Sequence, residues 1–279
     1  MRVHFHTFGC KANQYDSERM RQASEARGAV AVADWRDADV CVVNTCTVTN
    51  QADAEARRFV RRVHRQNPTA RLVVAGCSAA LRPGDYEVLG GVTAVVGGAD
   101  ASRVARVVAG GGRGRALVPL ELRSALERID TEPVGAELLR ERAGATRGWL
   151  KIQDGCDRRC SFCATRLARG PSRSRPARDV IREARLLART HPELVLTGIH
   201  IGHYGRDLEE PITLSRLVAR LLDEVPAVRL RLGSVEATEV DDLLIELIAT
   251  SSGALAPHLH MPLQQVLLDA HPVVNVLVA

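Results

Sequence analysis

The residues best suited to chemistry in this sequence are cysteines, and three of them share one short loop. Residues 155–163 read GCDRRCSFC, which places Cys156, Cys160 and Cys163 in a CxxxCxxC pattern directly after a predicted strand. Three thiolates on one loop can hold three irons of a 4Fe-4S cluster and leave the fourth iron open to a small molecule. A structural zinc ion needs four ligands, and the nearest other cysteine, Cys77, is far away in the sequence, although a histidine could complete such a site. We predict a cluster here, with structural zinc as the alternative.

A second group of cysteines follows predicted strands in the first third of the chain. The strands 3–8, 40–45 and 72–76 end just before Cys10, Cys46 and Cys77, respectively. Parallel strands present their carboxyl ends at one edge of a sheet, where open α/β folds bind ligands. We therefore predict a second three-cysteine cluster site. Cys41 lies inside a strand and is predicted to pack as a small apolar residue.

Arginine carries nearly all the positive charge of the chain. Between Gly155 and Arg189 there are ten arginines against three acidic residues, whereas the formal charge of the whole chain is only +5. Such a cluster is either the solvated face of a helix or a surface that binds phosphate groups.

The elements that must position these residues alternate between strands and helices, which is typical of parallel α/β architecture. The first series has predicted strands at 3–8, 40–45, 72–76 and 94–96, with helices at 16–27 and 53–66. The second has predicted strands at 149–153, 194–197, 228–232 and 258–262, with helices at 177–189, 214–224 and 240–250. The remaining chain is too short for a complete (β/α) barrel of about 250 residues.

The predicted fold class is accordingly α/β, with a doubly wound parallel sheet followed by a partial, truncated (β/α) barrel. We expect an N-terminal domain at 1–120, a charged linker at 121–146 that follows a glycine-rich stretch, and the partial barrel at 147–279.

The composition is that of a globular protein, with 279 residues of which 46% are apolar and 25% charged. The N-terminus lacks the apolar core of a secretory signal. The sequence also has no run of about 20 apolar residues, which is the length needed to span a membrane. We therefore expect a cytoplasmic protein, without membrane attachment, whose cysteines stay reduced.

These motifs together resemble those of a known family. The CxxxCxxC pattern, with an aromatic residue before its last cysteine, is similar to that of the radical S-adenosylmethionine (SAM) superfamily. The runs TFGCKANQYDSE at 7–18, NTC at 44–46 and AGC at 75–77 resemble those of the methylthiotransferases. Within that family, GCKANQY is most similar to the enzymes that act on threonylcarbamoyladenosine in tRNA. The resemblance extends from about residue 1 to Gln264.

The resemblance implies two 4Fe-4S clusters and SAM as cofactors. The cluster on Cys156, Cys160 and Cys163 would cleave SAM to a 5′-deoxyadenosyl radical, which takes hydrogen from C2 of the modified adenosine beside the anticodon. The second cluster, on Cys10, Cys46 and Cys77, would supply the sulfur. The implied partners are a tRNA anticodon stem-loop, an electron donor such as flavodoxin or ferredoxin, and a sulfur donor. Other tRNA adenosine derivatives or a ribosomal protein are the alternative substrates.

The same resemblance suggests further site residues. For SAM these are Phe162, Gly198, Arg231, Ser234 and Glu236, where a surface ion pair is the alternative for Arg231 and Glu236. For RNA they are Arg169, Arg173 and Arg175, where the alternative is a solvated loop. His258 and His260 are given no role, and no further catalytic residue is assigned.

After Gln264 the sequence departs from the pattern of the family, which continues through the barrel to a small RNA-binding β-barrel domain. A chain that ends at Ala279 without that domain is expected to be a fragment or the product of a frameshift. The alternative to an active enzyme is therefore a catalytically impaired remnant that binds clusters without turning over.

Overall fold

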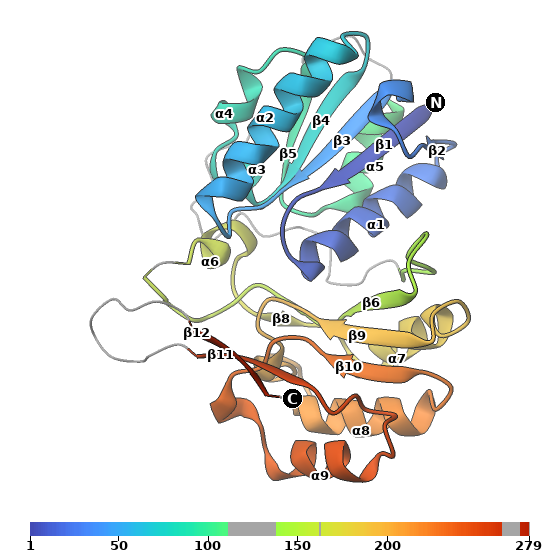
Figure 1. Cartoon of the computed structure of the whole chain (residues 1–279), viewed down its shortest axis with the longest axis vertical. Coiled ribbons are helices and arrows are strands. Elements are labelled where there is room, and N and C mark those ends of the chain that lie inside the picture. The colour runs from blue at the N-terminus through green and yellow to red at the C-terminus, as the bar shows by residue number, and fades with distance from the viewer. Residues whose placement is uncertain (111–137, 162, 264–273, 279) are drawn as a thin grey trace. The chain divides into compact units, whose positions relative to one another are not determined.

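The computed structural model describes residues 1–110, 138–161, 163–263 and 274–278. The chain divides into two compact units (Figure 1). The first is Met1–Pro133 together with Cys156–Pro171, and the second is Val134–Gly155 together with Ser172–Ala279. The CxxxCxxC loop thus belongs to the same compact unit as the N-terminal sheet.

A five-stranded parallel sheet with the order β2-β1-β3-β4-β5 forms the centre of the first unit. Its strands are β1 (Arg2–Thr7), β2 (Val30–Ala31), β3 (Val40–Thr45), β4 (Arg71–Gly76) and β5 (Val92–Gly97). The strands predicted at 3–8, 40–45, 72–76 and 94–96 are confirmed to within a few residues. In the register, Val3 lies beside Val40, and Val40 lies beside Arg71.

Helices cover both faces of this sheet, as a doubly wound fold requires (Figure 1). The helices are α1 (Lys11–Glu25) and α5 (Ala101–Ala109) on one face, and α2 (Asn50–Gln66), α3 (Cys77–Leu81) and α4 (Gly84–Glu87) on the other. Along β3, Val40 and Val42 pack with the first set while Cys41 and Val43 pack with the second. Cys41 is confirmed as a core residue, and burial raises its pKa to about 12.

Two helices of this unit differ from the sequence prediction. Helix α1 begins at Lys11, directly after Cys10, and not near Asp16. The first turn closes through the backbone N–H of Gln14, which donates to the carbonyl of Cys10 at 3.0 Å. Helix α5 was not predicted. It begins at Ala101, after the N-cap residue Asp100, whose carboxylate accepts the backbone N–H of Arg103 at 2.7 Å.

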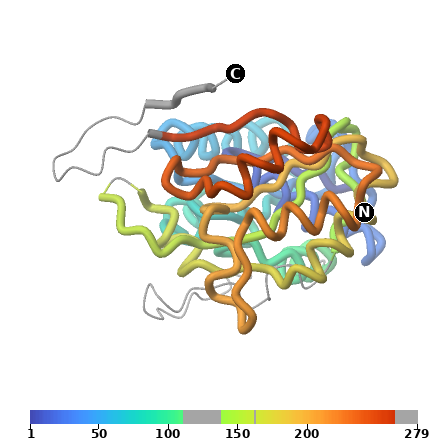
Figure 2. Tube along the Cα trace, turned by 90° about the horizontal axis from the view of Figure 1, so that it is seen from below, coloured from blue at the N-terminus to red at the C-terminus, as the bar shows by residue number. Residues whose placement is uncertain are grey.

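The second unit contains a three-stranded parallel sheet with the order β10-β9-β6. The strands are β6 (Arg147–Lys151), β9 (Glu193–Thr197) and β10 (Arg229–Leu232), and the helices are α7 (Ala177–Leu187), α8 (Leu214–Glu224) and α9 (Asp242–Thr250). Short β7 (Gln153–Asp154) and β8 (Arg173–Ser174) pair antiparallel, and the 3-10 helices η2 (Ile201–His203) and η3 (Ala237–Glu239) follow β9 and β10. Figure 2 lets the chain be followed through α7, α8 and α9.

The fourth predicted strand of this series is found at β11 (Leu259–Leu263), but its main partner is unexpected. It pairs antiparallel with β12 (Val274–Val278), and it meets the end of β10 only through an isolated parallel bridge between Ser234 and His260. Among the strands that the structure describes, no closed barrel forms, so the α/β fold class with a partial barrel is confirmed.

Two further expectations concern the linker and membrane-spanning helices. The predicted linker at 121–146 lies largely outside the described residues, so its bounds stay a prediction. None of the helices that the structure describes is both long enough and apolar enough to cross a membrane.

Candidate cluster-binding site

Tight glycine turns place two of the N-terminal cysteines at the carboxyl edge of the first sheet. Gly9 and Gly76, which precede Cys10 and Cys77, have φ values of +97° and +95°, in the left-handed region that glycine adopts without strain. A Cβ atom on Gly9 would lie 2.3 Å from Sγ of Cys46. The backbone at Gly9 therefore lies directly against Cys46, a closeness that only glycine permits.

The three thiols at this edge lie near enough to one another to interact electrostatically. Burial is the main reason that the pKa of Cys77 is raised to about 11, and the neighbouring thiols of Cys10 and Cys46 act in the same direction. Burial also raises the pKa of Cys46, whose sulfur accepts the backbone N–H of Val48 at 3.4 Å. Iron binds the thiolate form, so cluster binding must displace these protons. Cys10 is the exposed member of the set.

A buried guanidinium faces the same edge of the sheet. Arg169 ends helix α6 (Thr165–Arg169), and its Nε donates to Sγ of Cys77 at 3.2 Å. One of its terminal nitrogens donates to Oδ1 of Asn13 at 3.0 Å and to Oδ2 of Asp16 at 2.8 Å. The guanidinium lowers the pKa of Cys77 and supplies positive charge beside thiols that must become anionic.

This placement argues against the predicted RNA contact for Arg169. Its side chain is only 5% exposed and is bound by groups of the N-terminal sheet unit, so it cannot present its charge to a phosphate. The run of arginines in the sequence gave no sign of these partners.

Asn13 is a site residue that the sequence analysis missed. Its side-chain nitrogen donates to the carbonyls of Phe8 at 2.6 Å and Thr45 at 3.0 Å. It therefore links the two segments that lead into Cys10 and Cys46. Asn13 and Asp16 are polar residues buried on α1, where the 3.6-residue periodicity favours apolar ones. That mismatch was the available signal.

The CxxxCxxC loop is held by backbone hydrogen bonds. The N–H of Cys156 donates to the carbonyl of Gly170 at 3.1 Å, and that of Cys163 donates to the carbonyl of Cys160 at 3.2 Å. The backbone N–H of Arg158 donates to Sγ of Cys156 at 3.4 Å, as expected for a sulfur that becomes a thiolate. Cys156 and Cys160 are half-buried and Cys163 is exposed, while Phe162 lies outside the described residues.

The donor set of each cysteine triplet fits an iron-sulfur cluster. Each offers three thiols and no disulfide, which is the ligand chemistry that such clusters take from proteins. At the N-terminal triplet, the missing Cβ of Gly9 and the cationic donor of Arg169 add room and charge compensation for an anionic group.

Three of the predicted SAM residues lie at the carboxyl edge of the second sheet. A Cβ atom on Gly198 would lie 2.8 Å from the carbonyl oxygen of Gln153, so this glycine permits close packing of two chain segments. Oγ of Ser234 lies 2.7 Å from Nδ1 of His260. Glu236 precedes η3, with Oε1 3.8 Å from Nε2 of His200. His260 is thereby given a structural partner.

Arg231 lies differently from the prediction. Its Nε donates to Oε1 of Glu193 at 2.9 Å, and Nε of Arg147 forms an ion pair with the same oxygen at 2.7 Å. Glu193 and Arg147 are the first residues of β9 and β6, so this guanidinium points toward the amino edge of the sheet and away from the predicted SAM residues. The ion-pair alternative is the one that the structure shows for Arg231, although the partner is Glu193 and not Glu236.

The remaining predicted RNA contacts are also shielded from solvent to different degrees. Arg175 is completely buried, where it donates to both oxygens of Glu183 at 3.1 and 2.9 Å and to the carbonyl of Lys151 at 2.7 Å. This burial argues against an RNA contact for Arg175 because a charge satisfied in the core cannot reach a phosphate. Arg173 is half-buried in β8.

Gln153 organises the loops that leave the second sheet, and the sequence analysis did not single it out. Its side-chain oxygen, Oε1, accepts the backbone N–H groups of Ile199 at 3.1 Å and His200 at 2.8 Å, and its side-chain nitrogen, Nε2, donates to the carbonyl of Gly155 at 2.7 Å. A fully buried glutamine at the end of a strand thus fixes the residues that follow β6 and β9.

Comparisons with known proteins bear on both units. Residues 2–97 match the family described as uncharacterized protein family UPF0004, and residues 150–264 match the Radical SAM superfamily. The chain is 37% identical over 265 residues to the threonylcarbamoyladenosine tRNA methylthiotransferase MtaB of Bacillus subtilis, a match that covers 94% of this chain and 57% of that protein. For the protein of the same name from Rickettsia prowazekii, the identity is 32% over 262 residues, covering 92% of this chain and 58% of the relative.

A relative with a different printed substrate is similar to nearly the same extent. The ribosomal protein uS12 methylthiotransferase RimO of Roseiflexus castenholzii is 34% identical over 298 residues, with coverage of 98% of this chain and 60% of that protein. The chain therefore spans less than two thirds of the length of each of these relatives.

Proposed function

We propose that the chain is a tRNA-modifying enzyme of the radical SAM methylthiotransferase family, which transfers a methylthio group. The proposed target is C2 of N6-threonylcarbamoyladenosine beside the anticodon. The two relatives named MtaB support this choice of substrate.

The observation that carries the proposal is the presence of two separate triplets of cysteine thiols in one compact unit. SAM cleavage alone requires only the CxxxCxxC loop. A second triplet at the edge of the N-terminal sheet supplies the ligands for a further cluster, which the insertion of sulfur requires.

In the proposed arrangement, each triplet has its own function. Cys156, Cys160 and Cys163 hold a 4Fe-4S cluster with one open iron, and Cys10, Cys46 and Cys77 hold the second. When bound and reduced, the first cluster supplies an electron that cleaves SAM to methionine and a 5′-deoxyadenosyl radical.

Other residues of the two units are proposed to position the reactants. Gly198, Ser234 and Glu236 line the carboxyl edge of the second sheet, where we assign SAM. Arg169 holds Cys77 through its Nε and acts as a positioning residue.

The proposed partners are a tRNA anticodon stem-loop, a protein electron donor such as flavodoxin or ferredoxin, and a sulfur donor. With Arg169 and Arg175 buried, the RNA contacts are reassigned to exposed arginines of the cluster loop, Arg158 and Arg159. An accessible guanidinium can release counterions from a phosphate, whereas a buried one cannot.

A ribosomal protein is the second candidate substrate, and the similarity to RimO favours it. The substrates separate in one experiment, in which the anaerobically reconstituted chain receives SAM, a reductant and either tRNA bearing threonylcarbamoyladenosine or ribosomal protein uS12. Mass spectrometry then reports where a methylthio group is gained. Modification of the tRNA alone supports the proposal, modification of uS12 alone moves the assignment to the second candidate, and modification of neither contradicts both.

A further inference from the structure

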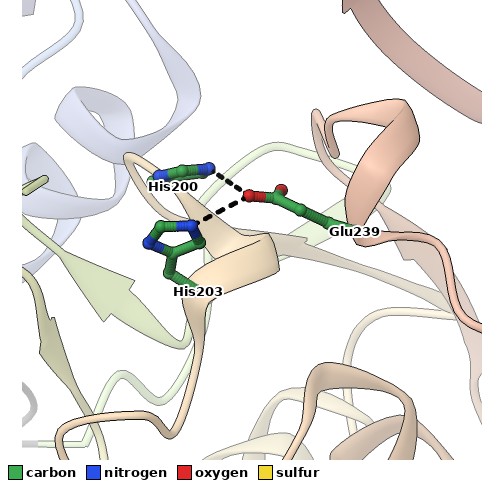
Figure 3. A group of neighbouring side chains, drawn as sticks. All are labelled: His200, His203 and Glu239. Carbon is green, nitrogen blue, oxygen red and sulfur yellow. Dashed lines mark hydrogen bonds and ion pairs between the residues drawn. The ribbon is translucent and has the colours of Figure 1, made fainter. Parts of the chain in front are cut away.

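Two histidines and one glutamate converge in the second unit (Figure 3). Nε2 of His200 and Nε2 of His203 lie 2.6 and 3.1 Å from the same oxygen of Glu239, Oε1. Among the residues that the structure describes, these form the only set of three potential metal ligands whose donor atoms all lie within 4.8 Å of one another.

The local fold brings the three side chains together from two loops. His200 precedes η2 and His203 ends it, so both histidines lie on one short helical turn after β9. Their rings stack with centroids 3.9 Å apart and planes at 28°, and both Nε2 atoms point at Glu239, as Figure 3 shows. Glu239 ends η3, which follows β10.

The carboxylate of Glu239 is held in place before any ion arrives. The backbone N–H of Glu236 donates to its other oxygen, Oε2, at 3.2 Å. A Cβ atom on Gly202 would lie 1.8 Å from Oε2, so the glycine between the two histidines makes room for this group. The side chains of His200 and Glu239 are 8% and 3% exposed, and that of His203 is 14% exposed.

The spacing of the three donor atoms suits a single ion. Nitrogen and oxygen ligands at about 2.0–2.2 Å in a tetrahedral site lie roughly 3.3 Å from one another. The two observed separations, 2.6 and 3.1 Å, are slightly shorter, so small side-chain shifts would admit the ion. Two histidine hydrogen bonds to one carboxylate oxygen would then be exchanged for three metal bonds.

The donor types select the class of metal. Imidazole suits zinc and its first-row neighbours, whereas magnesium and calcium prefer all-oxygen sites. The carboxylate of Glu239 supplies the oxygen ligand, and Nε2 of each histidine already points at its Oε1. Three protein ligands leave a fourth coordination position for water. A second carboxylate lies close to this site, with Oε1 of Glu236 at 3.8 Å from Nε2 of His200.

We propose that His200, His203 and Glu239 bind one divalent transition-metal ion of the zinc class. This site lies wholly in the second unit, uses no cysteine and goes beyond the proposed methylthiotransferase function. It stands or fails independently of that function.

The test uses the full chain with its clusters reconstituted, so that iron occupies the thiolates. After equilibration with Zn²⁺ and removal of free metal, native mass spectrometry counts the zinc bound per chain. We expect one zinc, with imidazole and oxygen but no sulfur in its X-ray absorption spectrum. Glu239→Gln keeps the shape and the acceptor for the N–H of Glu236, and His203→Asn removes one ring. Each should weaken zinc binding beyond the roughly 10–100-fold that loss of a supporting group causes.

His64→Asn, which removes a histidine of helix α2 in the first unit, is the matched control and should bind zinc as the parent chain does. Circular dichroism in the absence of zinc verifies that each variant is folded, and if Glu239→Gln misfolds, His203→Asn decides. The proposal is overturned if the parent chain takes up no zinc, if both folded variants bind zinc with unchanged affinity, or if the absorption spectrum shows sulfur ligands. The three side chains would then form only a hydrogen-bonded cluster.

Discussion

At the scale of single residues, the structure separates arginines that the sequence presents as one group. Arg169 and Arg175 lie in the same basic run as Arg158 and Arg159, yet the first two are buried and the other two are exposed. The difference depends on the carboxylates that the two buried side chains meet in the fold, Asp16 for Arg169 and Glu183 for Arg175, which the run of arginines does not reveal. By contrast, the placement of the cysteines after strands could be predicted, because the hydrophobic runs before them mark the strand ends.

The buried pair of Arg169 and Asp16 makes a direct prediction about stability. Arg169→Gln removes the cationic partner of the buried Asp16 carboxylate, so we expect a loss of about 3–5 kcal/mol in the free energy of unfolding of the first unit. Urea denaturation of the apoprotein measures the loss. Arg166→Gln, on the same short helix but less buried, should change the free energy little. Equal effects of the two substitutions would contradict the assigned role of Arg169.

Glu193 makes a prediction about pH. Burial alone would raise its pKa, but the hydrogen bond and charge of Arg231, with the charges of Arg147 and Arg229, lower it below 4.5. A lowered pKa in the folded state contributes stability above the pKa of the unfolded state, and that contribution is lost as the pH falls through the folded value. Because solvent partly screens the group, we expect Glu193→Gln to cost about 1 kcal/mol at pH 7.

The difference in the free energy of unfolding between the parent chain and Glu193→Gln should shrink toward zero below pH 4, as measured by urea denaturation across the pH range. A difference that grows on acidification would rule out this ion-pair arrangement.

At the scale of elements, the strands were easier to predict than the helix boundaries. Strands β3 and β4 are continuous apolar runs buried on both faces, which marks them in the sequence. Helix α1 begins with Lys11, and its first turn buries the polar Asn13, so an amphipathic pattern is found only further along. Strand β11 was placed correctly, but its antiparallel partner follows residues 264–273, which lie outside the described residues.

The turn before Cys10 allows a matched test of the N-terminal site. Gly9→Ala would place a methyl group 2.3 Å from Sγ of Cys46 at a φ of +97°, so we expect the chain to lose about half of its reconstituted iron. Gly28→Ala imposes similar backbone strain at a φ of +85°, but no atom lies within 4 Å of the added group. Iron analysis after reconstitution should show full loading for Gly28→Ala. Full loading for Gly9→Ala would show that the turn does not shape a cluster site.

We expect different effects on RNA binding from the arginines of the cluster loop and those of helix α7. Each phosphate contact that is lost lowers the salt slope of binding by roughly one unit, so Arg158→Ala with Arg159→Ala should lower it by about two. Arg178 and Arg182 are exposed on α7, where they lie within 4.0 Å of Asp179, and their substitution should leave the slope unchanged as on a solvated helix face. Titration of a fluorescent anticodon stem-loop at several salt concentrations measures both. An unchanged salt slope for the Arg158 and Arg159 variant would mean that the cluster loop is solvated and does not contact RNA.

At the scale of the whole molecule, the candidate site residues are divided between the two compact units. The first unit supplies both cysteine triplets, and the second supplies the strand ends to which we assign SAM. The sequence analysis placed the CxxxCxxC loop in the partial barrel at 147–279, whereas the structure groups residues 156–171 with the N-terminal sheet. The convergence of His200, His203 and Glu239 could not be predicted, since it requires two loops separated in the sequence to meet in space.

Iron content and SAM cleavage, measured together on matched cysteine variants, test the central claim most directly. The parent chain should hold about eight irons after anaerobic reconstitution, as two four-iron clusters require. Replacing Cys156, Cys160 and Cys163 with Ala should halve the iron and abolish formation of 5′-deoxyadenosine. Replacing Cys10, Cys46 and Cys77 should halve the iron while SAM cleavage persists, and Cys41→Ser should retain both. Full iron in either triple variant, or SAM cleavage that survives loss of the CxxxCxxC cysteines, would contradict the account.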